Sequence, residues 1–132
     1  MTVVVDASFL GTVLSDDGPD GERARARLSS DPELSAPHLI DLEVTSWLRR
    51  EVLGGRMDSD RARRALVELA LMRMVRYPHT AFLQRIWELR HNVSAYDASY
   101  VALAEALGAP LLTADIRLAN APGIRCEVER FE

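Results

Sequence analysis

Short runs of consecutive apolar residues alternate along the chain with longer stretches in which apolar positions recur every three or four residues. The short runs are typical of buried strands, and the longer stretches of helices with one packed face. The runs predict strands at residues 2–5, 34–37, 111–113 and 124–128. A further segment, Met74–Tyr77, fits either a short strand or the end of a helix.

The helical stretches have recognisable starts and stops. Gly54 and Gly55 end one of them, Thr80 and Ser94 each suit the cap of another, and a turn-forming cluster occupies residues 16–21. Helices are therefore predicted at residues 8–14, 22–29, 38–53, 58–74, 80–90, 94–107 and 116–119. Strands alternating with helices predict an α/β fold around a mainly parallel sheet, and 132 residues suit a single domain, residues 1–132.

Composition narrows the possible functions. The net charge is −4, which argues against a broad basic surface for nucleic acid, although bound metal ions can supply local positive charge. All 16 basic residues are arginine, so a Walker-type nucleotide loop and Schiff-base chemistry are excluded. No apolar run approaches the length of a membrane span. The single cysteine, Cys126, is expected as a small core residue and fits a reducing cytoplasm.

Four carboxylates occur among apolar residues or at the edge of an apolar element: Asp6, Glu43, Asp97 and Asp115. Asp6 and Asp115 each follow a predicted strand, and ligands of parallel sheets bind beyond these carboxyl ends. Glu43 shares the apolar helix face of Trp47. Two carboxylates about 4 Å apart repel by roughly 4 kcal/mol at an effective dielectric near 20, so a cluster of them requires a hard divalent cation. The pattern favours a magnesium- or manganese-dependent phosphoryl-transfer enzyme.

Each acid also has a local structural explanation. Asp6 and Asp115 suit helix caps or Asx turns, and Asp97 completes a capping box that begins at Ser94. Glu43 suits a rim position that reaches water, and the same helix carries two rival acids, Asp41 and Glu51. No single acid decides between a cap and a site. Only their convergence in space can do so.

Other chemistry is poorly supported by the sequence. The three histidines are scattered without the spacing of zinc ligands, and no serine is flanked by glycines as a hydrolase nucleophile would be. Trp47 and Trp87 recur with other apolar residues at helical spacing, so we expect them in the core or at an interface rather than stacked on bases.

Four segments, in this order and spacing, resemble the PIN-domain ribonucleases and most closely the VapC toxins of type II toxin–antitoxin pairs: Val3–Ser8, Ala36–Val44, Leu89–Ala104 and Leu111–Asp115. The resemblance implies a PIN-like three-layer fold in which helices flank the sheet. It also implies one pocket where Asp6, Glu43, Asp97 and Asp115 bind Mg²⁺ or Mn²⁺ and catalyse hydrolysis of RNA.

The resemblance extends to neighbouring residues and to partners. The family carries Ser or Thr near the first and last acids, matched by Ser8 and Thr113, and an Arg-x-Asn stretch before the third acid, matched by Arg90 and Asn92. Whether Arg90 and Asn92 touch substrate or only fix a helix start stays open. The family implies a cytoplasmic homodimer and a small VapB-like antitoxin that blocks the pocket.

Three other functions remain as alternatives. A PIN-type nuclease of RNA processing or decay would have the same acids but no antitoxin. A non-enzymatic binding module would use them only as caps and surface charges. An aspartyl-phosphate enzyme is disfavoured, because lysine is absent and no second aspartate stands two positions after Asp6.

Overall fold

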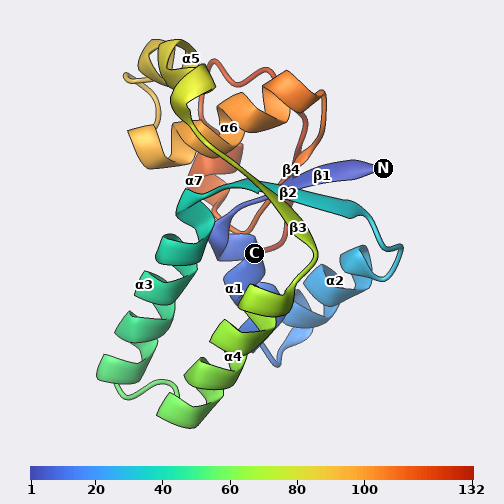
Figure 1. The fold of residues 1–132 in the computed structure, drawn as a ribbon, viewed down its shortest axis with the longest axis vertical. Coiled ribbons are helices and arrows are strands. Elements are labelled where there is room, and N and C mark those ends of the chain that lie inside the picture. The colour runs from blue at the N-terminus through green and yellow to red at the C-terminus, as the bar shows by residue number, and fades with distance from the viewer.

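The computed structural model describes all 132 residues, and its centre is one five-stranded sheet (Figure 1). Every neighbouring pair of strands is parallel, so the sheet expected to be mainly parallel is wholly parallel. The strand order is β3-β2-β1-β4-β5. The strands are β1 (Thr2–Val5), β2 (Glu33–Pro37), β3 (Met74–Tyr77), β4 (Leu111–Thr113) and β5 (Val128–Arg130).

Helices cover both faces of this sheet, which confirms the predicted three-layer α/β fold (Figure 1). One layer holds α1 (Ala7–Ser15), α2 (Pro19–Leu28), α3 (Leu39–Leu53) and α4 (Ser59–Leu71). The opposite layer holds the 3₁₀ turn η1 (Thr80–Phe82), α5 (Leu83–Glu88) and α6 (Ala95–Leu107). The short α7 (Ile116–Ala119) follows β4. None of these helices is long and apolar enough to cross a lipid bilayer.

The core lies where β1, β4 and α6 meet. Val3, Val4 and Val5 are fully buried, as a parallel strand covered on both faces requires. In α6 the seven consecutive residues 98–104 are all buried, and several are alanine or serine. Small side chains let this helix lie close to the sheet. The first turn of α6 is thereby fixed against the ends of the central strands.

The strand order determines where a ligand can bind. The chain passes from β1 to β2 and β3 on one side, then returns to place β4 on the other side of β1. The connections after β1 and β4 therefore leave the sheet in different directions and open a crevice at their carboxyl ends. Asp6 follows β1 directly, and Asp115 follows β4 after one residue.

Most predicted elements are present, with shifted boundaries. Met74–Tyr77, left open between strand and helix end, is strand β3 and pairs with β2. The last strand was expected at residues 124–128 but spans Val128–Arg130, because Ile124 and Cys126 reach the core from a loop instead. The turn cluster is shorter than expected, since α2 begins at Pro19, a favourable first helical position.

The helix predicted for residues 80–90 is also different. It begins as a 3₁₀ turn and ends at Glu88, and Thr80 provides no side-chain cap. Cys126 is only half-buried rather than a true core residue, and burial raises the pKa of its thiol to about 11. Trp87 is 66% exposed, whereas Trp47 packs partly into the core.

Candidate active site

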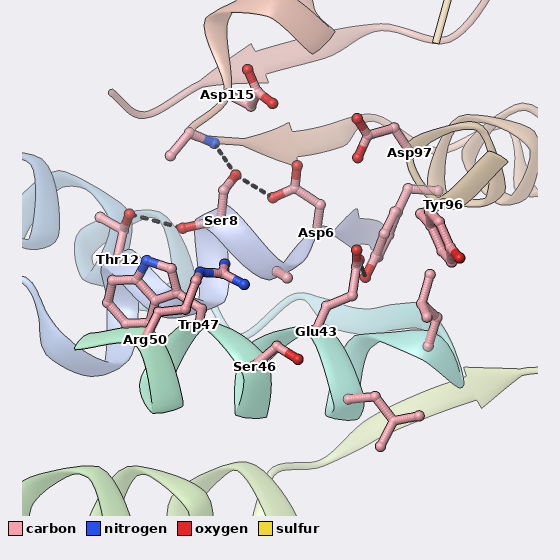
Figure 2. Close-up of a pocket in the computed structure, with 15 residues that line it drawn as sticks. Asp6, Ser8, Thr12, Glu43, Ser46, Trp47, Arg50, Tyr96, Asp97 and Asp115 are labelled. Carbon is pink, nitrogen blue, oxygen red and sulfur yellow. Dashed lines mark hydrogen bonds between the residues drawn. The ribbon is translucent and has the colours of Figure 1, made fainter. Parts of the chain in front are cut away.

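A cavity of about 620 Å³ opens in the crevice at the carboxyl ends of β1 and β4 (Figure 2). Its wall includes all four acids singled out from the sequence: Asp6, Glu43, Asp97 and Asp115. They come from four separate elements, namely the end of β1, helix α3, the first turn of α6 and the end of β4. Figure 2 shows the carboxylates around one hollow. The fold thus brings together acids that lie far apart in sequence.

Asp6 is the most buried of these acids, with only 5% of its surface exposed. It caps α1, because one carboxylate oxygen accepts a hydrogen bond from the backbone N–H of Phe9 at 2.9 Å. Ser8 donates to the same oxygen at 2.7 Å, and the Thr113 hydroxyl donates to the other oxygen. Burial raises the pKa of Asp6 to about 6, the three donors oppose this rise, and the charge of Asp97 adds to it.

Ser8 and Thr113 join the two strand ends into one polar network. Besides donating to Asp6, Ser8 accepts the backbone N–H of Ala114 at 2.9 Å. Thr113, fully buried, likewise accepts the N–H of Asp115 at 3.0 Å. The two hydroxyls therefore orient Asp6 and also fix the chain that carries Asp115. Ser8 itself lines the cavity, whereas Thr113 lies behind its wall, and both support the acids that face it.

Glu43 lies on the cavity face of α3 and is held by a residue of α6. The Tyr100 hydroxyl donates a hydrogen bond to Glu43 Oε1 at 2.6 Å. Burial raises the pKa of Glu43, and the negative charge of Asp97 adds to this rise. The hydrogen bond from Tyr100 and the positive charge of Arg50 both lower the pKa. Tyr100 is itself only 1% exposed. Its pKa is raised, mainly by burial and next by its hydrogen bond to Glu43. The phenol therefore stays protonated and keeps donating.

Asp97 and Asp115 occupy the opposite side of the cavity (Figure 2). Ser94 caps α6 by accepting the backbone N–H of Asp97 at 3.1 Å, and the Asp97 side chain lines the cavity. Burial raises the pKa of Asp97, and repulsion from Asp115 raises it further. Asp115 caps α7 by accepting the backbone N–H of Arg117 at 2.9 Å.

The site has the donor chemistry of a hard-cation site. Its acids repel one another, and the ligands they offer are carboxylate oxygens, which suit Mg²⁺, Mn²⁺ or Ca²⁺ rather than softer metals. No three His, Cys, Asp or Glu side chains of the structure are close enough to hold one ion together. An ion there would therefore be bound by a subset of the acids with waters between, or after the carboxylates move inward.

Two residues expected near the site lie away from the cavity. Arg90 is stacked over the exposed ring of Trp87, 4.6 Å from its centre, and donates to the Trp87 carbonyl. Asn92 donates to the carbonyl of Pro122 at 3.0 Å. Neither lines the cavity wall. Both contacts lie in the segment before α6, and whether either residue touches substrate stays open.

The rival acids of α3 are engaged elsewhere. Asp41 forms a two-point ion pair with Arg76 of β3, at 2.7 and 2.9 Å. Glu51 pairs with Arg56 in the turn after the helix. Neither carboxylate lines the cavity.

Several residues of the site were missed in the sequence. Tyr100 was not singled out, although it follows Asp97 by three positions on one helix face. Arg50 was missed as well, although it follows Glu43 by seven positions and so shares its face. The other wall residues that carry a polar group and were not predicted for the site are Thr12, Ser46, Tyr96 and Trp47, of which Trp47 was expected in the core or at an interface.

Comparison with known proteins gives the family. The pattern of the PIN domain matches residues 3–124, nearly the whole chain. The chain belongs to the PIN-domain family. Ribonuclease VapC1 of Mycobacterium tuberculosis is 46% identical over 127 residues, which cover 96% of this chain and 95% of VapC1. This relative is a ribonuclease by name, and the match runs along nearly its whole length.

Solved structures agree on the PIN fold. The crystal structure of Mycobacterium tuberculosis VapC20, described as a toxin that cleaves the sarcin–ricin loop, has a TM-score of 0.69 at 21% identity and covers 93% of this chain and 96% of its own. VapBC2 of Rickettsia felis, bound to a promoter DNA fragment, has a TM-score of 0.69 at 13% identity and full coverage of both chains. At these identities the likeness shows the fold alone.

Proposed function

We propose that this protein is a metal-dependent endoribonuclease that hydrolyses RNA phosphodiester bonds as the toxin of a VapBC-type pair. The observation that carries the proposal is the convergence of Asp6, Glu43, Asp97 and Asp115 on one cavity wall. Burial raises the pKa values of Asp6, Glu43 and Asp97, the charge of Asp97 adds to the rise at Asp6 and Glu43, and the charge of Asp115 adds to the rise at Asp97. Caps alone would not require four acids from separate elements to face one hollow. The family of VapC ribonucleases supplies the reaction class.

In this proposal Asp6 and Asp97 would hold the principal ion, Mg²⁺ or Mn²⁺, and Glu43 and Asp115 would complete the site directly or through waters. Such an ion would lower the pKa of a water and offset charge that develops on the phosphoryl oxygens. Ser8 and Thr113 keep the Asp6 carboxylate aimed, since each donates to one of its oxygens. A water attacks phosphorus in line and loses its proton, the P–O3′ bond breaks, and the leaving 3′-oxygen takes up a proton, which leaves a 3′-hydroxyl and a 5′-phosphate.

The chain's own groups prepare the site before substrate arrives. Tyr100 holds Glu43 against rotation away from the cavity. The apolar face of α6 and the buried strands exclude water from beneath Asp6, which strengthens every electrostatic interaction there. The residues are thus held in place in advance, and little reorganisation is needed during the reaction.

The partners follow from the family. We propose a homodimer and a small VapB-like antitoxin whose segment closes the acidic cavity, with a cytoplasmic location that suits the single free cysteine. An antitoxin arginine would fit, because a guanidinium pairs at two points with a carboxylate. Copurification with a small partner encoded beside it separates this function from that of an antitoxin-free PIN nuclease.

The direct test is cleavage of total RNA by the purified chain with Mg²⁺ or Mn²⁺. We expect cleavage that EDTA abolishes, and products whose 5′ ends carry phosphate. Asp97→Asn should lose at least about a hundredfold in rate, as expected when a charge at the reacting centre is removed. Glu68→Gln, an exposed acid of α4 without a side-chain partner, is the matched control and should cleave normally. Full activity of Asp97→Asn would contradict the proposal.

A further inference from the structure

Arg50 is the one basic side chain on the cavity wall. The other charged side chains of the cavity are four carboxylates, which repel an approaching polyanion, so the guanidinium is the one protein group there whose charge attracts it. Figure 2 shows Arg50 pointing into the cavity beside the ring of Trp47. Its charge reaches the acids, because it lowers the pKa of Glu43.

The guanidinium of Arg50 has no hydrogen bond or ion pair in the structure, although many other arginines of the chain do. Arg27, Arg76 and Arg85, for example, each form a two-point pair with a carboxylate. All five N–H donors of Arg50 are therefore available, in the fork geometry that matches a phosphate. An unpaired guanidinium among acidic side chains of the cavity wall is suited to bind an anionic ligand.

Two further donors share its helix face. Ser46 and Trp47 precede Arg50 by one turn on α3 and line the same cavity, and neither the Ser46 hydroxyl nor the Trp47 indole N–H donates within the protein. The Trp47 ring is seated on Gly11 of α1, where an added Cβ would lie 3.3 Å from it. This contact fixes one face of the ring and keeps the indole at the cavity wall.

We propose that Arg50, with Ser46 and Trp47, binds the RNA phosphate next to the one that is cleaved, and so sets substrate affinity rather than the rate of the chemical step. The backbone position of Arg50 follows that of Glu43 by seven residues, about 10 Å along the helix axis, so its guanidinium approaches the cavity from the end away from Glu43, where the neighbouring phosphate along the RNA strand would lie. This inference rests on the proposed function, and it assigns a role to residues that the metal chemistry does not use.

The test compares Arg50→Gln with Arg49→Gln. Arg49 is the adjacent exposed arginine, lies outside the cavity and has no side-chain partner, so it controls for net charge. With Mn²⁺ and a short single-stranded RNA, Arg50→Gln should raise KM about tenfold with kcat within about twofold. The slope of log affinity against log salt should fall by about 0.7, as expected for one lost phosphate contact on a single strand. Arg50→Lys, which keeps the charge but not the fork, should recover part of the loss.

Equal KM values for the Arg50 and Arg49 variants would overturn the inference. So would an Arg50→Gln protein whose only change is tighter or weaker Mn²⁺ binding, since Arg50 would then be merely an internal counter-ion of the acids. A binding arm separates this inference from the proposed function. Fluorescence anisotropy of the labelled RNA in EDTA measures the Arg50 contribution even if wild-type protein fails to cleave. Loss of cleavage with retained Arg50-dependent binding would refute the nuclease proposal alone.

Discussion

At the scale of single residues, Asp6 combines two demands that oppose each other. Three donors, from Ser8, Phe9 and Thr113, favour its ionised form, whereas burial and the nearby Asp97 favour the protonated form. Burial wins, and the pKa stands at about 6 instead of 3.8. At neutral pH the carboxylate is thus ionised against an unfavourable environment, and a cation would relieve that cost.

This predicts how stability depends on pH without metal. Between about pH 4 and pH 6 the folded protein keeps a proton on Asp6 that the unfolded chain releases, so stability falls as pH rises through this window. The loss is about 3 kcal/mol by pH 7, since a tenfold change in an acid constant corresponds to about 1.4 kcal/mol. Glu43 and Asp97 shift in the same direction.

Urea unfolding in EDTA across this pH range measures the effect. Asp6→Asn should flatten the profile, and the exposed-acid control Glu68→Gln should leave it unchanged. Stability that rises with pH between 4 and 6 in the wild-type protein would contradict this account of Asp6.

Tyr100 provides the second prediction at this scale. Tyr100→Phe keeps the packing of the ring but removes the hydrogen bond to Glu43, so we expect a loss of about 1 to 2 kcal/mol of stability and slower RNA cleavage. Tyr77→Phe is the matched control, because Tyr77 of β3 lies outside the cavity and its hydroxyl makes no hydrogen bond. Equal behaviour of the two variants would show that Tyr100 does not position Glu43.

At the scale of helices and strands, the cap and the site turn out to be the same residues. Asp6 caps α1 and Asp115 caps α7, as expected if these acids had only structural roles, yet both also line the cavity. A cap position holds a carboxylate at a helix start, and here the helix starts follow the strand ends where ligands bind. Sequence pattern could not separate the two roles because the fold uses both at once.

The surroundings of two helix glycines predict that replacing each by alanine should destabilise the protein to different extents. An Ala Cβ at Gly21 of α2 would lie 1.9 Å from the carbonyl oxygen of Asp16, so the usual gain from Gly→Ala in a helix should reverse to a loss of about 3 kcal/mol. At Gly108, which ends α6 with φ of 61°, space is open and Gly→Ala should cost about 1 kcal/mol through backbone strain alone.

Chemical denaturation of the two variants is the measurement. Asn at position 108 tolerates the left-handed conformation and should recover much of the loss there, whereas no side chain should be tolerated at position 21. A Gly21→Ala protein as stable as wild type would mean that α2 does not pack against the end of α1 as described.

At the scale of the whole molecule, the α/β class and the parallel sheet could be predicted because strands and helices each have a characteristic spacing of apolar residues. The four acids could be singled out because they interrupt apolar segments or follow them. Sequence reasoning did not recover Tyr100 or Arg50, whose roles depend on α3 and α6 meeting across the cavity. The last strand was misplaced because pairing with β4, a contact distant in sequence, decides where β5 lies. A run of apolar residues indicates that a segment is buried, but it does not indicate which residues pair with a neighbouring strand.

The account depends most on the acids forming one cation site. Isothermal titration of Mn²⁺ into wild-type protein, Asp97→Asn and the control Glu68→Gln tests this directly. We expect binding to the wild type and to Glu68→Gln with equal affinity, and at least about tenfold weaker binding to Asp97→Asn. Asp97 is the best choice because Ser94 caps the helix through the Asp97 backbone, so the substitution spares the fold. Equal Mn²⁺ affinity of Asp97→Asn and wild type would contradict the account.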